Sequence, residues 1–318
     1  MTKKWFIFAF IAMFFASLAF NACKDDKKDK DDDPEIPEVD PNDPSRIAED
    51  NLIAYFAFEG DGKDVISAMM PSNTATTTVT FPEGRRGKCF QGTDDGLKSG
   101  LLYALPEGSK LKDLKAFSVA FWSLMAPNTI ETTNAPEQMV FQIDAIDGDW
   151  VWGNLYFLQK RNFPEQENSD FRDYGEMVSA FFKYDDAVAW QGQTANGWFL
   201  DVTATQWRHI ICTYDNVSSE FHAYVNGVHI TAFDGTPYMG VNRKQSEDGP
   251  ALGDLKFKNA QNFVIGAWAE RLKGASLTED VWAAPYRGKL DELRIYDRGL
   301  TTEEVTALYQ AEIKYINK

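Results

Sequence analysis

The chain has 318 residues, of which 44% are hydrophobic and 14% aromatic, so most of it can fold around a large core and is not disordered. Its formal net charge of −16 at pH 7 repels phosphate backbones and anionic lipid headgroups, which makes nucleic acid a poor partner. Neutral ligands and divalent cations remain compatible with this charge.

The first residues are typical of a secretory signal. Two lysines precede an apolar run, Trp5 to Phe20, that is short for a membrane span. The run is followed by Ala22 and Cys23, an arrangement that resembles the lipobox of bacterial lipoproteins, in which a small residue precedes the cysteine that receives diacylglycerol. The resemblance implies a lipoprotein signal peptide over residues 1–22 and lipidation of Cys23. The alternative is ordinary signal cleavage near Ala22.

Residues 23–45 are predicted to form a disordered, solvated tether. Aspartate and lysine dominate the segment up to Asp33, prolines follow among acidic residues, and almost nothing is apolar. Acidic runs directly behind a lipidated cysteine resemble the export signals of Bacteroidetes lipoproteins. The expected location is therefore the bacterial outer membrane, with the protein lipid-anchored and facing the cell exterior. A spacer within the periplasm is the alternative.

From Arg46 onward, short β-rich runs are separated by Gly, Asn, Asp and Pro, and this spacing predicts an all-β sandwich. Asn226 and Gly227 predict a type I′ hairpin, because both accept positive φ. A short closing helix is predicted near Thr302, where a hydroxyl precedes acidic residues. The predicted strands are Leu52 to Phe58, Lys88 to Gln91, Phe117 to Leu124, Gln138 to Ile143, Val151 to Leu158, Met177 to Lys183, Trp207 to Tyr214, Glu220 to Val225, Val228 to Phe233, Asn262 to Ala267 and Arg287 to Tyr296.

These runs resemble, in order, the motifs of laminin G-like jelly rolls of the concanavalin A-like lectin/glucanase superfamily. The matching blocks are Leu52 to Gly60, Gly87 to Gly92, Phe117 to Trp122, Trp207 to Asp215, Tyr224 to Val228 and Gly288 to Leu300. The resemblance implies a two-sheet antiparallel sandwich with a short C-terminal helix over residues 46–318. It implies no single activity, because the family includes glycan-binding and adhesion modules and the superfamily includes glucanases.

The nearest imitation of a glucanase site runs from Gln142 to Asp147. Retaining glucanases of this superfamily carry two carboxylates on alternating positions of one strand, about 5 Å apart. Gln142 stands where the nucleophile is expected, and an amide cannot form a glycosyl-enzyme. The sequence also has no convincing Ser/His/Asp set, zinc motif or phosphate loop. We therefore expect no catalytic residues and a non-enzymatic protein.

Five residues are predicted to bind a ligand: Trp150, Trp152, Asn154, Tyr156 and Trp268. The first four alternate along a predicted strand and so share one face, and Trp268 follows another strand-like run. Sugar rings stack their C–H faces on aromatic rings, and an amide can bind their hydroxyls. The predicted partner is a polysaccharide or a glycoprotein glycan. The alternative is that these rings fill space beneath an inserted loop.

A calcium site is the second predicted feature. Glu59, Asp61 and Asp64 place oxygen ligands in a glycine-containing turn, and calcium takes six to eight oxygens. The family resemblance implies that the first and last strands are neighbours, which would bring Asp291 towards this turn. A solvated turn without metal is the alternative.

Two cysteines, Cys89 and Cys212, fall within the predicted sandwich. Two buried free thiols and one disulfide formed in an oxidising envelope are both compatible with the sequence.

The leading hypothesis is a cell-surface lipoprotein whose jelly roll binds glycan without cleaving it. The alternatives are a protein-binding adhesion or assembly module, and a glycoside hydrolase with an unrecognised carboxylate pair. A groove lined by aromatic rings favours a sugar chain, whereas a wide flat patch favours a protein. Inward carboxylates about 5 to 9 Å apart would favour hydrolysis.

Overall fold

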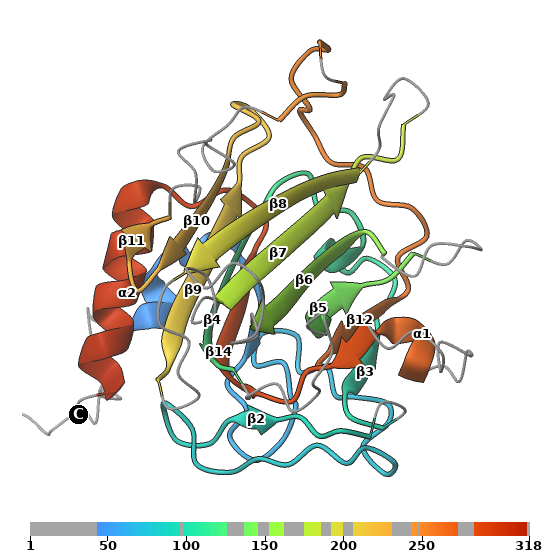
Figure 1. The fold of residues 1–318 in the computed structure, drawn as a ribbon, viewed down its shortest axis with the longest axis vertical. Helices are drawn as coiled ribbons and strands as arrows, with labels where there is room; N and C mark the ends of the chain where they lie inside the picture. The colour runs from blue at the N-terminus through green and yellow to red at the C-terminus, as the bar shows by residue number, and fades with distance from the viewer. Residues whose placement is uncertain are drawn as a thin grey trace, which may run out of the picture. The chain divides into compact units, whose positions relative to one another are not determined.

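The structure is a computed structural model that describes residues 43–95, 98–125, 137–145, 153–161, 175–185, 192–199, 206–230, 243–246, 248–272 and 283–316. Three residues predicted to be functional, Cys23, Trp150 and Trp152, lie outside these ranges. In the described part, two antiparallel sheets pack across an apolar core, and a long helix follows the last strand (Figure 1). The predicted two-sheet sandwich with a C-terminal helix is confirmed. Within the same ranges, no helix is both long enough and apolar enough to cross a membrane.

The first sheet has the strand order β1-β14-β4-β9-β10-β11, and β2 also pairs with β14. Its strands are β1 (Leu52–Phe56), β2 (Phe90–Gln91), β4 (Phe117–Leu124), β9 (Arg208–Tyr214), β10 (Phe221–Val225), β11 (Val228–His229) and β14 (Lys289–Tyr296). These segments are rich in aromatic and β-branched residues, which suit a pleated and half-buried surface. The first strand pairs with the last, Leu52 lying opposite Tyr296.

The second sheet has the strand order β3-β12-β5-β6-β7-β8. Its strands are β3 (Leu101–Ala104), β5 (Glu137–Ile143), β6 (Leu155–Arg161), β7 (Gly175–Phe182), β8 (Gly192–Phe199) and β12 (Asn262–Ile265). A short strand, β13 (Ala283–Pro285), pairs in parallel with β5, and a one-turn helix, α1 (Ala269–Leu272), follows β12.

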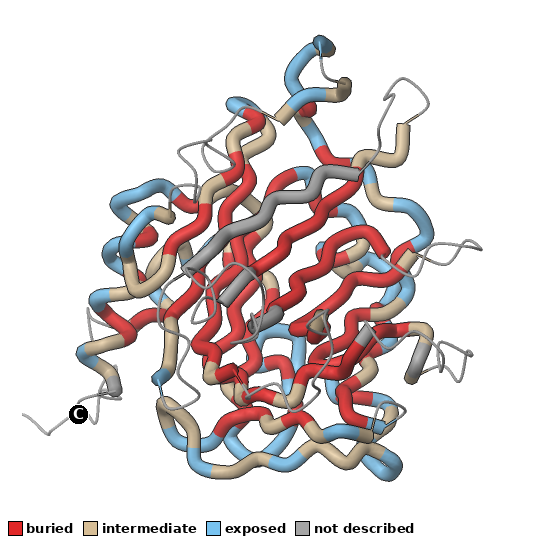
Figure 2. The backbone as a smooth tube through the Cα atoms, in the orientation of Figure 1, coloured by how far each residue is buried: buried red, intermediate tan, exposed pale blue. Residues whose placement is uncertain are grey.

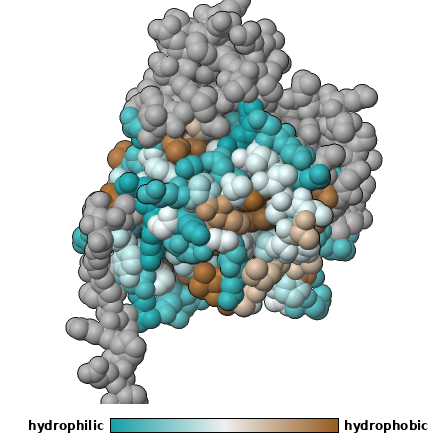
Figure 3. Space-filling model, turned by 90° about the horizontal axis from the view of Figure 1, so that it is seen from below, coloured by the Kyte–Doolittle hydropathy of each residue, from teal (hydrophilic) through white to brown (hydrophobic). Residues whose placement is uncertain are grey.

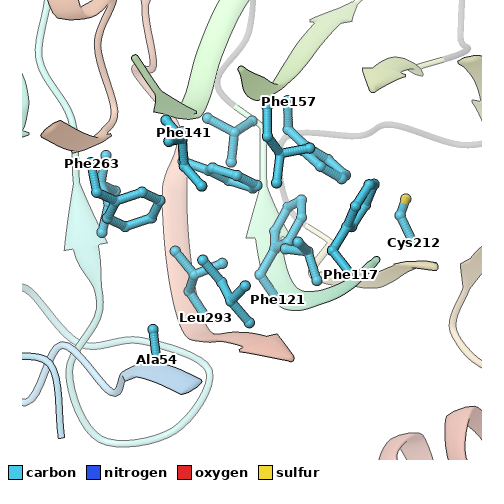
Figure 4. Close-up of a cluster of buried hydrophobic side chains, with 14 of the residues drawn as sticks. Ala54, Phe117, Phe121, Phe141, Phe157, Cys212, Phe263 and Leu293 are labelled. Atoms are coloured by element: carbon cyan, nitrogen blue, oxygen red, sulfur yellow. The ribbon is translucent and has the colours of Figure 1, made fainter. Parts of the chain in front are cut away.

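The core between the sheets is dominated by aromatic rings. Figure 4 shows Phe117 and Phe121 of the first sheet close to Phe141 and Phe157 of the second. The ring centroids of Phe141 and Phe157 are 4.7 Å apart, and those of Phe117 and Phe157 are 6.3 Å apart. Buried residues follow the strands of both sheets, whereas exposed residues gather in the connecting loops (Figure 2). The interlocked rings hold the two sheets in a fixed relation, which also fixes the outward side chains.

Helix α2 (Thr302–Ile316) covers the outer face of the first sheet. The helix begins with a capping box: the Thr301 N–H donates to the Glu304 carboxylate at 2.9 Å, and the Glu304 N–H donates to the Thr301 hydroxyl at 3.3 Å. Val305 and Leu308 on its apolar side pack on outward side chains of the sheet. These sheet residues include Ala120, Ile211, Tyr224 and Tyr296.

A buried ionic network lies between β14 and α2. A bulge in β14 gives Glu292 a φ of 54° and shifts the pairing register between Asp291 and Arg294. The Arg294 guanidinium donates to the carboxylates of Glu292, at 2.6 Å, and of Glu312 on the helix. It also lies over the ring of Tyr55, 4.2 Å from the centroid. Arg294, Glu292 and Glu312 have no exposed surface, so the helix closes this network away from water.

The hairpin between β10 and β11 has the predicted turn. Asn226 has a φ of 51° and Gly227 a φ of 74°, as a type I′ turn requires. Val225 and Val228 are paired directly across the turn. Gly227 also packs closely on α2, because a Cβ atom at this position would come within 2.5 Å of the Tyr309 ring.

Candidate functional site

The outer face of the second sheet carries a row of four aromatic rings, Trp268, Tyr156, Phe182 and Tyr184, which we call the aromatic row. Successive ring centroids are 6.5 Å, 6.3 Å and 5.4 Å apart. The last two rings, Phe182 and Tyr184, are stacked with an interplanar angle of 11°. Two of the five residues predicted to bind ligand, Tyr156 and Trp268, are therefore neighbours in one aromatic cluster, together with aliphatic side chains of β5, β6 and β7.

Strand alternation places the middle of the aromatic row. In β6 and β7, Phe157 and Phe181 belong to the core between the sheets, whereas Tyr156 and Phe182 belong to the separate outer cluster. The core rings anchor both strands, so the outward rings have little freedom to separate.

Trp268 is held by the chain that leaves β12. Gly266, with a φ of 80°, turns the chain there, and a Cβ atom on this residue would lie 2.2 Å from the Phe90 ring. The Trp268 indole N–H donates to the Ala284 carbonyl at 3.2 Å. The next residue, Ala269, donates its N–H to the Gln142 side chain at 2.8 Å. Trp268 is completely buried, so it forms the closed end of the aromatic row.

Asn154 lies outside the aromatic row and is committed to backbone contacts. Its side-chain N–H₂ donates to the carbonyls of Asp144 and Lys258, and its side-chain oxygen accepts the Lys258 N–H at 2.7 Å. The predicted strand from Val151 instead begins at Leu155, after Gly153 with a φ of 84°. Asn154 therefore fastens a loop to the sheet and offers no free amide to a ligand.

The open end of the aromatic row is Tyr184, which is half-buried. Its hydroxyl donates to the Gly153 carbonyl at 3.1 Å. Burial raises the pKa of Tyr184 to about 12, and burial also raises the pKa of Tyr156. Both phenols are therefore neutral at physiological pH. Tyr156 and Phe182 are buried, as Trp268 is, so Tyr184 is the ring of the aromatic row that a ligand can reach.

Asp144, a carboxylate within the run that resembles a glucanase site, is occupied by hydrogen bonds that hold the fold together. Asp144 is buried, and its oxygens accept the N–H groups of Gln261 and Asn262 and the side-chain N–H₂ of Asn262. Gln142 is likewise buried and holds the Ala269 N–H. Asp147, the other acid of the motif, lies outside the described residues.

The four residues predicted to bind calcium all accept hydrogen bonds. Both oxygens of Asp64 are occupied by donors of its own turn and of β1, and Asp291 accepts two backbone N–H groups at 2.8 Å. Glu59 and Asp61 accept the N–H groups of Lys88 and Lys63 at the surface. In the part of the chain that the structure describes, no group of three or more His, Cys, Asp or Glu side chains is arranged to hold a metal. Calcium binding stays a prediction.

Both cysteines of the sandwich are buried free thiols. Burial raises the pKa of Cys89 to about 12 and also raises that of Cys212, so neither is a reactive thiolate at neutral pH.

The face at the β2 end of the sandwich is mostly hydrophilic. Figure 3 shows its apolar side chains in small patches separated by polar ones. The large hydrophobic residues exposed in the described chain are Val65, Ile66, Met70, Val217 and Val228. On the described part of this face there is no wide flat apolar surface of the kind that marks protein interfaces.

The sequence reasoning missed two members of the aromatic row, Phe182 and Tyr184. Phe182 belongs to the predicted strand from Met177 to Lys183, and Tyr184 directly follows that strand. Phe182 and Tyr184 alternate along the chain, which could have indicated that they share one face. Only the pairing of β6 with β7 shows that this face is the one that carries Tyr156.

Comparisons with known proteins agree with this architecture. A model of the family Laminin_G_3, described as the concanavalin A-like lectin/glucanases superfamily, matches residues 102–306. A comparison with curated proteins finds no match.

Among solved structures, the chain is similar to the binding domain of Paraclostridial Mosquitocidal Protein 1, with 15% identity, a TM-score of 0.51 and coverage of 82% of this chain and 52% of that one. It is also similar to domain 4 of AbnA, a GH43 extracellular arabinanase from Geobacillus stearothermophilus, in complex with arabinotriose, with 21% identity, a TM-score of 0.45 and coverage of 82% and 98%. The binding domain of botulinum neurotoxin serotype G matches with 14% identity, a TM-score of 0.49 and coverage of 82% and 51%. The chain thus spans about half the length of the two toxin domains.

At 15% identity, the likeness to the mosquitocidal domain is one of fold. The family match is more direct, because it spans more than half of the chain and includes strands of both sheets. The chain belongs to the concanavalin A-like lectin/glucanase superfamily.

Proposed function

We propose that this protein is a cell-surface lipoprotein whose sandwich binds a polysaccharide or a glycoprotein glycan without cleaving it. The observation that carries the proposal is the aromatic row, with Tyr184 at its open end.

The physical basis is stacking on a surface held in place beforehand. Tyr184 lies flat against Phe182, which is anchored in β7, so its ring loses little freedom when a sugar binds. A ring contact of this kind contributes about 1 kcal/mol. Stacking on Tyr184 together with further contacts to the glycan, offset by ordering costs, corresponds to dissociation constants from micromolar to millimolar. The net charge of −16 favours neutral over anionic glycans.

The proposed absence of catalysis rests on the contacts of two residues. Gln142 is an amide that accepts the Ala269 N–H, and the Asp144 carboxylate is occupied by the N–H groups of Gln261 and Asn262. A glycosidase needs one acid and one nucleophile or base on opposite sides of the bond that it cleaves.

The proposed anchor is Cys23, followed by the acidic tether. Two or three acyl chains on one cysteine hold a protein durably at a membrane, whereas a single chain does not. In this proposal the sandwich is displayed on the outer membrane and faces the exterior.

Affinity electrophoresis through gels that contain different neutral polysaccharides tests the binding role. We expect at least one polysaccharide to retard the protein, and Tyr184→Ala to weaken that binding about fivefold through loss of about 1 kcal/mol of stacking. Trp152 is predicted to bind ligand but lies outside the described ranges, and Trp152→Ala tests its role in the same gels. Tyr315→Ala is the matched control, because Tyr315 is also half-buried but lies on α2, under Arg86.

Two outcomes would contradict the proposal. One is unchanged migration across a broad panel of polysaccharides and on a glycan array. The other is binding that Tyr184→Ala and Tyr315→Ala reduce equally, with both variants folded by circular dichroism.

A further inference from the structure

Two histidines lie side by side on the hairpin of β10 and β11. The Nδ1 atom of His222 is 3.1 Å from the Nε2 atom of His229. The strand register explains this closeness: His229 is paired with Tyr224, so His222, two residues earlier in β10, is its diagonal neighbour on the same face. The tight Asn226–Gly227 turn fixes the register of the pair.

The distance between the two nitrogens matches that between neighbouring ligands of one metal ion. With metal–nitrogen bonds of about 2.0 to 2.1 Å, two ligands are about 3.3 Å apart at a tetrahedral angle and about 2.9 Å apart at a right angle. The observed 3.1 Å lies between these values. The spacing of the two nitrogens therefore already suits one ion, and the rings need to turn from each other towards it without moving apart.

A carboxylate supports one of the two rings. The Nε2 atom of His222 is 3.3 Å from the Glu220 carboxylate, and a hydrogen bond there places the ring proton on Nε2. Nδ1 of His222 is then free of a proton and faces His229. Histidines that bind metals usually donate their other N–H to such an acceptor, which orients the ring and makes it a better ligand.

The second ring is also oriented, and it is open to solvent. The rings of His229 and Tyr224 are in an edge contact at 5.0 Å, and the Tyr224 hydroxyl is 3.3 Å from that of Thr302 at the start of α2. His229 is exposed and His222 is partly exposed, so an ion can enter from solvent.

We propose that His222 and His229 form a binding site for a divalent transition-metal ion of the Cu²⁺, Ni²⁺ or Zn²⁺ class, with Glu220 orienting His222. Imidazole ligands suit these ions and not calcium, and affinity should follow the order in which Cu²⁺ binds most tightly. In the metal-free protein the Nε2–H of His229 donates to Nδ1 of His222. On binding, the ion takes the place of that proton, which moves to Nδ1 of His229 through solvent. Water fills the remaining coordination positions.

Titration of the full chain, purified without a polyhistidine tag, tests the site. Isothermal titration with Cu²⁺ and separately with Zn²⁺ should give one ion per chain, and the electron paramagnetic resonance spectrum of the Cu²⁺ form should show two nitrogen ligands. His222→Gln and His229→Gln should each weaken binding more than tenfold. Glu220→Gln should weaken it about tenfold, as expected for loss of a supporting hydrogen bond. Val228→Thr, on the same hairpin, is the matched control and should leave binding unchanged.

A second measurement avoids variants altogether. Diethyl pyrocarbonate modifies accessible imidazoles, and Zn²⁺ should protect His222 and His229 from it when the sites are mapped by mass spectrometry. The third histidine, His209, is completely buried and serves as an internal reference. Absence of protection would overturn the proposal, as would metal binding that survives in both histidine variants.

Discussion

The residue with the most demanding environment is Arg294, a guanidinium with no exposed surface between β14 and α2. Glu292 and Glu312 supply its counter-charges, and the Trp122 indole N–H donates to the other oxygen of Glu312 at 3.3 Å. Charges removed from water are tolerated only when each keeps its partners. Removing one member alone therefore destabilises the protein by more than that member contributes to the intact network, because its former partners stay buried without it.

Replacing Glu312 tests this argument. Glu312→Ala leaves Arg294 buried with one counter-charge fewer, and we expect the free energy of unfolding to fall by about 3 to 5 kcal/mol in urea denaturation. The control is Glu49→Gln, which removes the surface pair of Arg46 and Glu49, two side chains about half exposed, and should cost less than about 1 kcal/mol. Equal effects of the two changes would contradict this account of the network.

His209 is the second unusual residue, and it makes a pH-dependent contribution. Its ring is buried between Trp122, at 4.8 Å, and Tyr309, at 5.7 Å, and among the residues that the structure describes neither ring nitrogen has a hydrogen-bond partner. Burial, together with the charge of Arg294, lowers the pKa of His209 to about 3. Below about pH 6.5 His209 is protonated in the unfolded chain but stays neutral in the folded chain. The free energy of unfolding therefore decreases as the pH falls from about 6.5 towards 3.

His209→Phe should remove that sensitivity, because phenylalanine keeps the stacking and does not titrate. The stability advantage of the variant over the wild type should be larger at pH 5 than at pH 7.5 by roughly 2 kcal/mol. His222 and His229 are the same in both proteins, so the comparison isolates His209. Urea denaturation at the two pH values measures it, and a constant difference would refute the assignment of a low pKa.

At the scale of elements, the hairpin and the C-terminal helix meet closely at Gly227 and Tyr309. Gly227→Ala should destabilise the protein for two reasons: alanine is strained at a φ of 74°, and its Cβ atom would press on the Tyr309 ring. We expect a loss of about 2 to 4 kcal/mol in the wild type. In a Tyr309→Ala background only the backbone strain remains, so the loss should fall to about 1 to 2 kcal/mol. Urea denaturation of the four proteins forms the cycle, and additive effects would show that the two elements are not coupled there.

The elements that sequence could reveal are those whose own residues carry a clear pattern. Phe117–Leu124 coincides with its prediction because it is continuous and apolar, and the Asn226–Gly227 turn was recognisable from two residues. Gly192–Phe199 was missed, since its two glycines and Asn-Gly pair are typical of a turn and only its pairing with β7 makes it a strand. Helix α2 extends to Ile316 because Glu312 is held by Arg294, a partner that no local pattern reveals.

The candidate site shows the same division. Tyr156 and Trp268 were identifiable as aromatic residues in or after strands, and the structure places them in one cluster. Asn154 was assigned to the same face on the assumption of an unbroken strand, whereas the positive φ of Gly153 interrupts the alternation. Sequence shows which residues are aromatic, but their grouping depends on the order of strands in the sheet.

At the scale of the whole molecule, the proposed anchor makes a separate prediction. Cys23→Ser should move the protein from the membrane fraction to the soluble fraction, because the acyl chains have no other attachment point in the proposal. Retention by a glycan gel should be unchanged, since the tether and the sandwich are intact. Fractionation and intact-mass measurement test this, and a serine variant that stays with the membrane would contradict lipid attachment at this residue.

The pairing of β1 with β14 determines when the molecule can be completed. During synthesis the first strand emerges early, yet its partner appears only when nearly the whole chain has been made. Until then the apolar side chains of Leu52–Phe56 have no permanent neighbour, and closing so distant a contact is slow. A chaperone that shields this short segment would limit aggregation until β14 is available, and a chain truncated before residue 289 could not close its first sheet in this way.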